Sequence, residues 1–356
     1  MSSLIAQQQT TKDGRLGFQL TFIALLTLLP LFMIVRNGMD ALTIVSTDPH
    51  DALQAANRGI VSLPRSASTT AARTVPLRFG IHDPGKVFVT DGNLKIRHVY
   101  ISWVNFDSKH LTDTLRELET QGYEPLLTIE PWQKDDSNTP LLPSIANGNY
   151  DDEIDRVAQS LSVLEKPAFV VWGHEMDQDL TVRYPWSGCP PEEYVKAYQH
   201  VVDRIRKQVP VKHQWVWTGV MKEGTCKYWP GDSYADFIGM PIYSFPAWDQ
   251  MTYGYIRDFK TTFSDKKRFV AELGKPIIIT ELGVNGSDDF EGFWLHQAFI
   301  SLASQPDLAA VVFFYAKDSD GVWGEKWNTP DWRVNPDLLR GLVEWKVGQV
   351  EQGQSR

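Results

Sequence analysis

Two glutamates stand at the ends of apolar runs, where an acidic side chain needs a reason. Glu175 follows the apolar run in VVWGHEMD, and Glu281 follows the apolar run in PIIITELGV. A buried carboxylate is costly unless it is paired or hydrogen-bonded, so an abrupt change from apolar to acidic residues suggests a chemical role. Glycosidic bonds are cleaved by two carboxyl groups that flank the scissile oxygen, one protonated and one ionised. The two glutamates therefore predict a catalytic pair for sugar chemistry.

Other polar and aromatic residues end further apolar runs and are candidates for holding a sugar. Aromatic rings offer flat apolar faces on which sugar rings stack, and many of the chain's thirteen tryptophans could equally be core residues. For Trp103 and Trp217, filling the interior of a barrel is an equally good interpretation. Asp177, Asp179 and the acidic run 135–137 are expected to be solvated loop charges. The substrate-binding candidates are His174, Tyr243, Trp132, Trp323, Glu130 and Trp103.

The chain alternates between apolar and amphipathic segments, and this alternation predicts the strands and helices that position these residues. Amphipathic stretches with helical spacing, such as 111–122, 150–165 and 191–208, lie between apolar runs rich in β-branched residues. Eight strands that alternate with helices predict a (β/α)8 TIM barrel, an α/β fold, with a doubly wound open sheet as the alternative. The expected strands are Leu77–Ile81, Ile96–Trp103, Glu124–Ile129, Ala168–Trp172, Gln214–Thr218, Phe237–Ile242, Pro276–Thr280 and Ala309–Tyr315.

The barrel hypothesis also places the two glutamates relative to one another. Active sites of such barrels lie at the carboxyl ends of the strands. Glu175 and Glu281 end the fourth and seventh strands, so we expect them to face each other across the mouth. There, like charges would raise the pKa of one carboxyl group and leave the other ionised.

Several segments together resemble glycoside hydrolase family 26, a (β/α)8 family of the retaining clan A that includes β-mannanases and some β-glucanases. They are VVWGHEMD, PIIITELGV, WPGDSYADFIGMPIY, EPLLTIEPW and VVFFYAKD, and the resemblance covers about residues 77 to 345. One departure concerns the fourth strand, where many family mannanases resemble an Arg-x-x-His-Glu pattern. Here the corresponding segment reads Val171-Trp172-Gly173-His174-Glu175, which argues against a strict mannanase.

The resemblance implies a role for each matching position. Glu175 would be the general acid/base and Glu281 the nucleophile of a double displacement, with their carboxyl carbons about 5–5.5 Å apart. His174 would orient catalytic or sugar groups, and Tyr243 would sit near the nucleophile. Glu130 would bond sugar hydroxyls, and the stacking platforms would be Trp132, Trp323 and Trp103.

Composition excludes several other classes of protein. A net charge of −9 argues against a nucleic-acid binder and fits a neutral substrate. The chain has no HExxH, no metal-ligand spacing of histidines, and no glycine-rich phosphate loop in a strand-to-helix setting, so we expect neither a metal nor a cofactor. The two cysteines, Cys189 and Cys226, follow adjacent strands of the expected barrel. We expect a disulfide between them, with two separate thiols as the alternative.

The N-terminal region predicts attachment to a membrane. The charge-free segment 16–35 lies between Arg15 and Arg36 and is about long enough to span a bilayer. We expect a cytoplasmic tail over 1–15, a signal anchor over 16–36, a flexible linker over 37–74 and the catalytic domain over 75–350; a cleaved signal peptide is the alternative. The domain would then face the periplasm or the exterior from the inner membrane.

The sequence thus predicts a membrane-anchored retaining endo-β-glycanase. The alternatives are a glycan-binding barrel that has lost turnover and a transglycosylase that passes the sugar to another sugar. The expected partners are a polysaccharide substrate, inner-membrane lipid and, as a candidate, a polysaccharide synthase complex. Mannan, mixed-linkage glucan and cellulose remain open as substrates.

Overall fold

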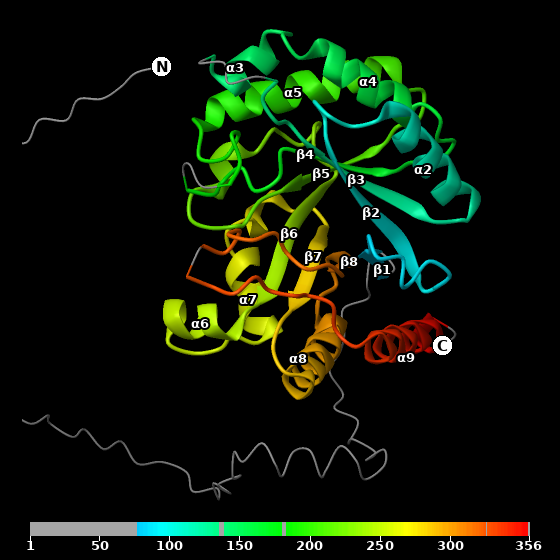
Figure 1. Cartoon of the computed structure of the whole chain (residues 1–356), viewed down its shortest axis with the longest axis vertical. Helices are drawn as coiled ribbons and strands as arrows, with labels where there is room; N and C mark the ends of the chain where they lie inside the picture. Colours follow the sequence, from blue (N-terminus) through cyan, green and yellow to red (C-terminus); the bar gives the residue numbers. More distant parts are fainter. Residues whose placement is uncertain (1–76, 135–138, 180–182, 325, 355–356) are drawn as a thin grey trace, which may run out of the picture. The chain divides into compact units, whose positions relative to one another are not determined.

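A closed parallel barrel is the centre of the molecule in the computed structural model, which describes residues 77–134, 139–179, 183–324 and 326–354 (Figure 1). Eight strands in these ranges pair in sequence order, and the last strand pairs with the first. The predicted barrel is therefore confirmed, and the open sheet is wrong. The strands are β1 Arg78–His82, β2 Leu94–Ser102, β3 Glu124–Glu130, β4 Phe169–Trp172, β5 Gln214–Thr218, β6 Phe237–Ser244, β7 Ile277–Val284 and β8 Leu308–Phe314.

Helices alternate with these strands and surround the barrel (Figure 1). The long helix α5 begins with Pro191, whose fixed backbone angle suits the first turn, and ends with Arg206 and Lys207 near its negative pole. The α-helices are α2 Ser108–Thr120, α3 Leu141–Ala146, α4 Asp151–Leu161, α5 Pro191–Gln208, α6 Pro246–Tyr253, α7 Phe259–Lys267, α8 Asp288–Ser301 and α9 Pro336–Gln354. Short 3-10 helices are η1 Thr225–Tyr228, η2 Ala271–Leu273 and η3 Leu302–Ser304.

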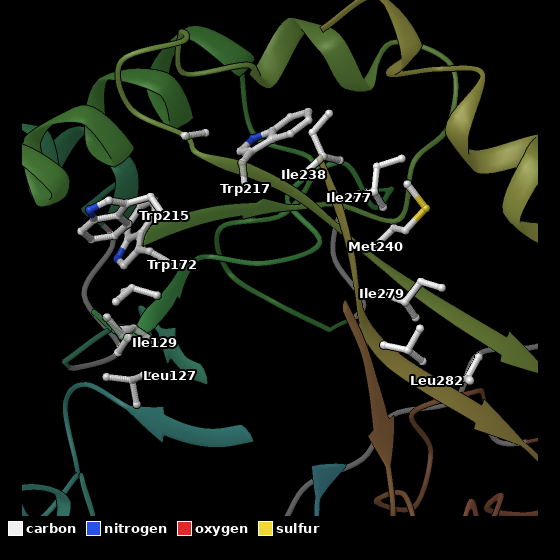
Figure 2. Close-up of a cluster of buried hydrophobic side chains, with 14 of the residues drawn as sticks. Leu127, Ile129, Trp172, Trp215, Trp217, Ile238, Met240, Ile277, Ile279 and Leu282 are labelled. Carbon is white, nitrogen blue, oxygen red and sulfur yellow. The ribbon is translucent and has the colours of Figure 1, made fainter. Parts of the chain in front are cut away.

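Two apolar layers follow from the alternation of side chains along the strands. One face of each strand fills the barrel with residues such as Val171, Val216 and Ile278. The other face packs outward against the helices, as Figure 2 shows for Trp217 and Ile279. Trp103 and Trp217 both belong to the outer layer, so neither fills the barrel interior as considered from the sequence.

The barrel interior is narrow, and glycines make this possible. A Cβ atom on Gly239 of β6 would lie 2.2 Å from Thr218 Oγ1 on β5. At Gly80 of β1 it would lie 2.5 Å from the Cβ atom of Ile96.

The predicted tail, anchor and linker (1–15, 16–36 and 37–74) lie outside the described residues. Among the helices that the structure does describe, none combines the length and the apolar character needed to cross a bilayer.

Candidate active site

Glu281 is held on β7 by two tyrosine hydroxyls. Tyr100 on β2 donates to Oε1 at 2.8 Å, and Tyr243 on β6 donates to Oε2 at 2.7 Å. Each carboxylate oxygen thus accepts one hydrogen bond, and the two bonds fix the orientation of the group. Burial, together with the Glu281 charge, raises the pKa of both tyrosines well above the usual value, so they remain donors.

An irregularity in the sheet turns Glu281 into the barrel. Ile277, Ile279 and Leu282 all pack in the outer layer, although strict alternation would put Leu282 on the inner face. The ladder to β6 shifts register at Pro241, which has no N–H to donate, and the ladder to β8 shifts between Ile279 and Leu282. Such bulges re-aim side chains, and here the change of parity allows Glu281 to meet the two tyrosines.

Glu175 sits beyond the end of β4 in an unusual backbone conformation. Its φ is +53°, in the left-handed region that non-glycine residues seldom adopt, and Gly173 just before it has φ +55°. Hydrogen bonds hold the strained residue on both sides: its N–H donates to Thr218 O at 2.9 Å, and its carbonyl accepts from Ser187 Oγ at 2.7 Å. Strain of this kind costs about 1–3 kcal/mol and persists where surroundings impose it, often at active sites.

The environment of Glu175 favours its protonated form. The residue is buried, and this burial raises the pKa of its carboxyl group to about 7, with the Glu281 charge acting in the same direction and Arg183 opposing both. The Gln178 side-chain amide donates to the same carboxyl group. One carboxyl group that holds its proton near neutral pH and another fixed by two donors form the acid-and-nucleophile combination that glycoside cleavage requires.

His174 is a buried neutral group that packs among aromatic rings beside Glu175. Its Nε2 lies 3.0 Å from the hydroxyl of Tyr184, and burial, with the nearby Arg183 charge, lowers its pKa to about 3. Trp186 stacks on Tyr184 with ring centroids 4.6 Å apart and donates from Nε1 to the His174 carbonyl at 2.7 Å. His174 therefore helps to hold Tyr184 and Trp186 in place beside Glu175. Its predicted contact with sugar stays a prediction.

Arg183 extends across the mouth of the barrel. Its guanidinium lies 4.0 Å from Glu175 Oε2 on one side and 3.9 Å from Asp318 Oδ1 on the other. Asp318 follows β8 and accepts hydrogen bonds from Nε1 of both Trp323 (2.8 Å) and Trp332 (3.0 Å). The arginine thus links the acid to the aromatic residues after β8.

The remaining predicted platforms differ in accessibility. Trp132 is half-buried, and its Nε1 donates to Glu130 Oε2 at 2.9 Å, so these two candidates lie together after β3. Trp323 is half-buried beside Tyr243, with ring centroids 5.8 Å apart. Trp103 is fully buried, stacks on Tyr150 at 5.3 Å and donates to the Trp132 carbonyl. Its predicted role as a stacking platform is therefore wrong, because no face of its ring is open to a sugar.

The predicted disulfide is also wrong in this structure, where Cys189 and Cys226 are both free. Each thiol faces a different backbone carbonyl: Cys189 donates to Pro185 O at 3.6 Å and Cys226 to Phe269 O at 2.9 Å. Cys226 and Tyr228 both lie in η1, and the Tyr228 hydroxyl donates to the Cys189 carbonyl at 2.9 Å. The two loops do meet, as adjacent strands predict, but their thiols do not.

Asp177 differs from the expectation of a solvated charge. It is buried, and its carboxylate accepts hydrogen bonds from Val220 N at 2.8 Å, Met221 N at 3.0 Å and the Thr225 hydroxyl. It therefore fastens the loop after β5 to the loop after β4. Asp179 fits the expectation, because its side chain is 98% exposed and pairs with Lys222.

Tyr100 and Arg183 are site residues that the sequence reasoning missed. The alternation of β2 contains the signal for Tyr100, because Ile96 fills the barrel and Tyr100 lies four residues further on the same face. Arg183 lies in a loop, and no periodicity reports where a loop side chain points.

Glu175 lines a cleft of about 710 Å³, and Tyr243, which donates to Glu281, lines it as well. It extends from Glu175 and Arg183 over Tyr243 and Trp323 to α6 and α7. A cavity of this volume at the carboxyl ends of barrel strands, lined by aromatic and polar groups, has the features of a ligand site.

The fold and the site together define a (β/α)8 barrel with one carboxyl group just after β4 and a second on β7, an arrangement suited to acid-assisted displacement at a sugar. The family model described as glycosyl hydrolase family 26 matches residues 136–282. Over these residues the chain is similar to that family.

Three known proteins illustrate the similarity. Endoglucanase H of Acetivibrio thermocellus is 27% identical over 264 residues, which are 70% of this chain and 27% of that protein. The β-1,3-xylanase TXYA of a Vibrio species is 24% identical over 216 residues, 57% of this chain and 40% of that protein. The chain thus spans well under half the length of these relatives. A modular endo-β-1,4-mannanase from Cellulomonas fimi has the same fold, with a TM-score of 0.52 and 14% identity over 75% of this chain and 70% of that one.

Proposed function

We propose that the protein is a retaining endo-β-glycanase that cleaves a β-linked polysaccharide by double displacement. One observation carries the proposal: the Glu175 and Glu281 carboxyl groups have opposite environments. Glu281 is clamped by two tyrosine hydroxyls, whereas Glu175 is buried and has a pKa raised to about 7. The match of residues 136–282 to a glycosidase family model supports the same reaction class.

In the first step, the Glu281 carboxylate attacks the anomeric carbon while Glu175 gives its proton to the departing sugar oxygen. The tyrosine hydroxyls orient the carboxylate and must weaken their hold as its charge passes to the new ester bond. In the second step, Glu175, now ionised, takes a proton from water, which attacks the same carbon and releases Glu281. The configuration at the anomeric carbon is retained after two inversions.

We also propose that segment 16–36 tethers the enzyme to the inner membrane with its cleft facing outward. The support is the charge-free run between Arg15 and Arg36, which has the length of a bilayer span. A tethered cleft would meet polysaccharide as it leaves the cell, which makes a polysaccharide synthase complex the natural partner to test.

The test is a reducing-sugar assay on mannan, mixed-linkage glucan and cellulose, with product anomers followed by NMR from the first minutes. We expect new reducing ends from at least one polymer, formed first as the β anomer. Early α anomer would overturn the retaining mechanism. Sugar transferred to added acceptor oligosaccharides, without new reducing ends, would replace hydrolysis with transglycosylation. Binding of a polymer without either product would indicate a barrel that has lost turnover.

A further inference from the structure

The cleft continues beyond the carboxyl pair along an aromatic wall, which we define as Phe245, Trp248, Tyr253 and Trp323. The rings brace one another edge to face: Trp323 meets Phe245 at 5.4 Å and Trp248 at 5.9 Å. Such contacts fix the rings, and Trp248, Tyr253 and Trp323 keep part of their surface exposed for sugar stacking, whereas Phe245 is buried behind them. Under the wall, Arg257 lies 3.9 Å from the Tyr253 ring centre and pairs with buried Asp249 at 2.9 Å, so its charge is already neutralised.

A second set of residues lining this cleft is cationic, and we define it as the basic wall: Lys222, Lys266 and Arg268. Lys222 follows β5 and pairs with the carboxylate of Asp179, which is 98% exposed. Ion pairs at such exposed positions contribute little to stability. Lys266 points from α7 toward the loop after β5, where it donates to the Val220 carbonyl. Arg268, just after α7, is exposed and lies 4.7 Å from the ring centre of Phe269.

The charge balance of this cleft is opposite to that of the chain. Without Arg257, which Asp249 neutralises, four lysines and arginines line it (the basic wall with Arg183), against Glu175, Asp179 and Asp265. The whole chain has 35 basic and 44 acidic residues. A cavity lined by one sign of charge focuses the field and gathers ligands of the other sign. Net charge averages over the whole surface, so it does not reveal this local excess.

We propose that the cleft takes an anionic β-glycan, whose rings stack on the aromatic wall while its acidic substituents face the basic wall. This inference rests on the proposed function and names its substrate class, in place of the neutral substrate expected from net charge. Carboxylate, sulfate and phosphate substituents share the required chemistry, since each presents anionic oxygens to ammonium and guanidinium groups.

The experiment compares polymers with one backbone and different charge. Binding is measured by affinity electrophoresis on the full chain with Glu281→Gln, so that cleavage does not consume the polymer. The pairs are carboxymethyl cellulose with hydroxyethyl cellulose, and carboxymethyl mannan with neutral mannan. Cellulose sulfate separates sulfate from carboxylate recognition. We expect an anionic polymer to bind at least tenfold more tightly than its neutral partner in low salt, and to lose this advantage in 0.5 M NaCl.

Variants of the basic wall locate the effect. Adding Lys222→Gln and Arg268→Gln is expected to weaken binding of the anionic polymer roughly tenfold and to leave the neutral polymer unchanged. Lys260→Gln, which removes an exposed charge on α7 outside the cleft lining, is the matched control and is expected to change neither.

Equal binding within both pairs, no binding of any anionic polymer, or an equal loss in the Lys260→Gln control would overturn the inference. Preference for cellulose sulfate alone would support it with sulfate as the anion. A polymer that binds in this way but is never cleaved by the unmodified enzyme would refute the proposed hydrolysis and leave the anionic site standing.

Discussion

At the residue scale, the two glutamates differ in what holds them. Glu175 is buried and has a strained backbone, whereas the Glu281 carboxylate is held by hydrogen bonds from two tyrosine hydroxyls. Replacing Glu281 with Ala removes the group that would form the covalent intermediate, so we expect turnover to fall on the order of 10⁴-fold with the fold intact. Added azide should restore cleavage of substrates with good leaving groups and yield a glycosyl azide of inverted configuration, measured by NMR. A rescued azide of retained configuration would show that Glu281 is not the nucleophile.

The pKa of Glu175 sets the expected pH dependence. The acid must hold its proton, and its pKa is about 7, so kcat/KM should fall as the pH rises through about 7. Arg183 lowers this pKa, and therefore Arg183→Gln should move the falling limb to higher pH. The pH profile of kcat/KM measures this shift, with Lys260→Gln as the control. A limb that stayed in place, or moved to lower pH, would contradict the electrostatic link between Arg183 and Glu175.

At the scale of elements, the loops after β4 and β5 depend on one buried carboxylate. Asp177→Ala would leave two backbone N–H groups without their acceptor, so we expect a loss of about 2 kcal/mol in the free energy of unfolding. The same loop carries Met221 and Lys222 into the cleft, and KM should rise as well. Denaturant unfolding and steady-state kinetics measure the two effects. Asp179→Ala, at an exposed position two residues away, should change stability little; equal losses in both variants would refute the anchoring role.

The same scale shows how far the sequence predicts this molecule. The strands begin and end within about two residues of the expected positions, except that β7 continues to Val284 beyond the expected end at Thr280. The agreement arises because apolar, β-branched runs indicate burial directly. The carboxyl pair could be predicted because barrel topology brings strand ends together. The turn of Glu281 into the barrel could not, because it depends on a bulge that changes the parity of β7. Likewise, the burial of Trp103 and Asp177 depends on residues distant in sequence, so no local sequence pattern predicts it.

For the whole molecule, the barrel should function without the segment that precedes it. A chain that starts at Thr74 retains every described strand and helix, so we expect it to fold and to keep the kcat/KM of the full chain. The full chain should sediment with membranes and require detergent for release, whereas the shortened one should not. Fractionation followed by activity assay measures both. A full chain recovered without detergent would overturn the proposed tether.

The left-handed backbone at Glu175 has a consequence for how this enzyme would respond to selection. Glycine adopts that conformation without strain, and asparagine does so more readily than glutamate. Each would also remove a buried carboxyl group from the cleft. A library screened only for heat resistance should therefore enrich Glu175→Gly and Glu175→Asn, and the most heat-resistant survivors would be inactive on natural glycans. Efforts to raise the thermal stability of the enzyme would have to screen for turnover at every round, because at this position a gain in stability costs catalytic activity.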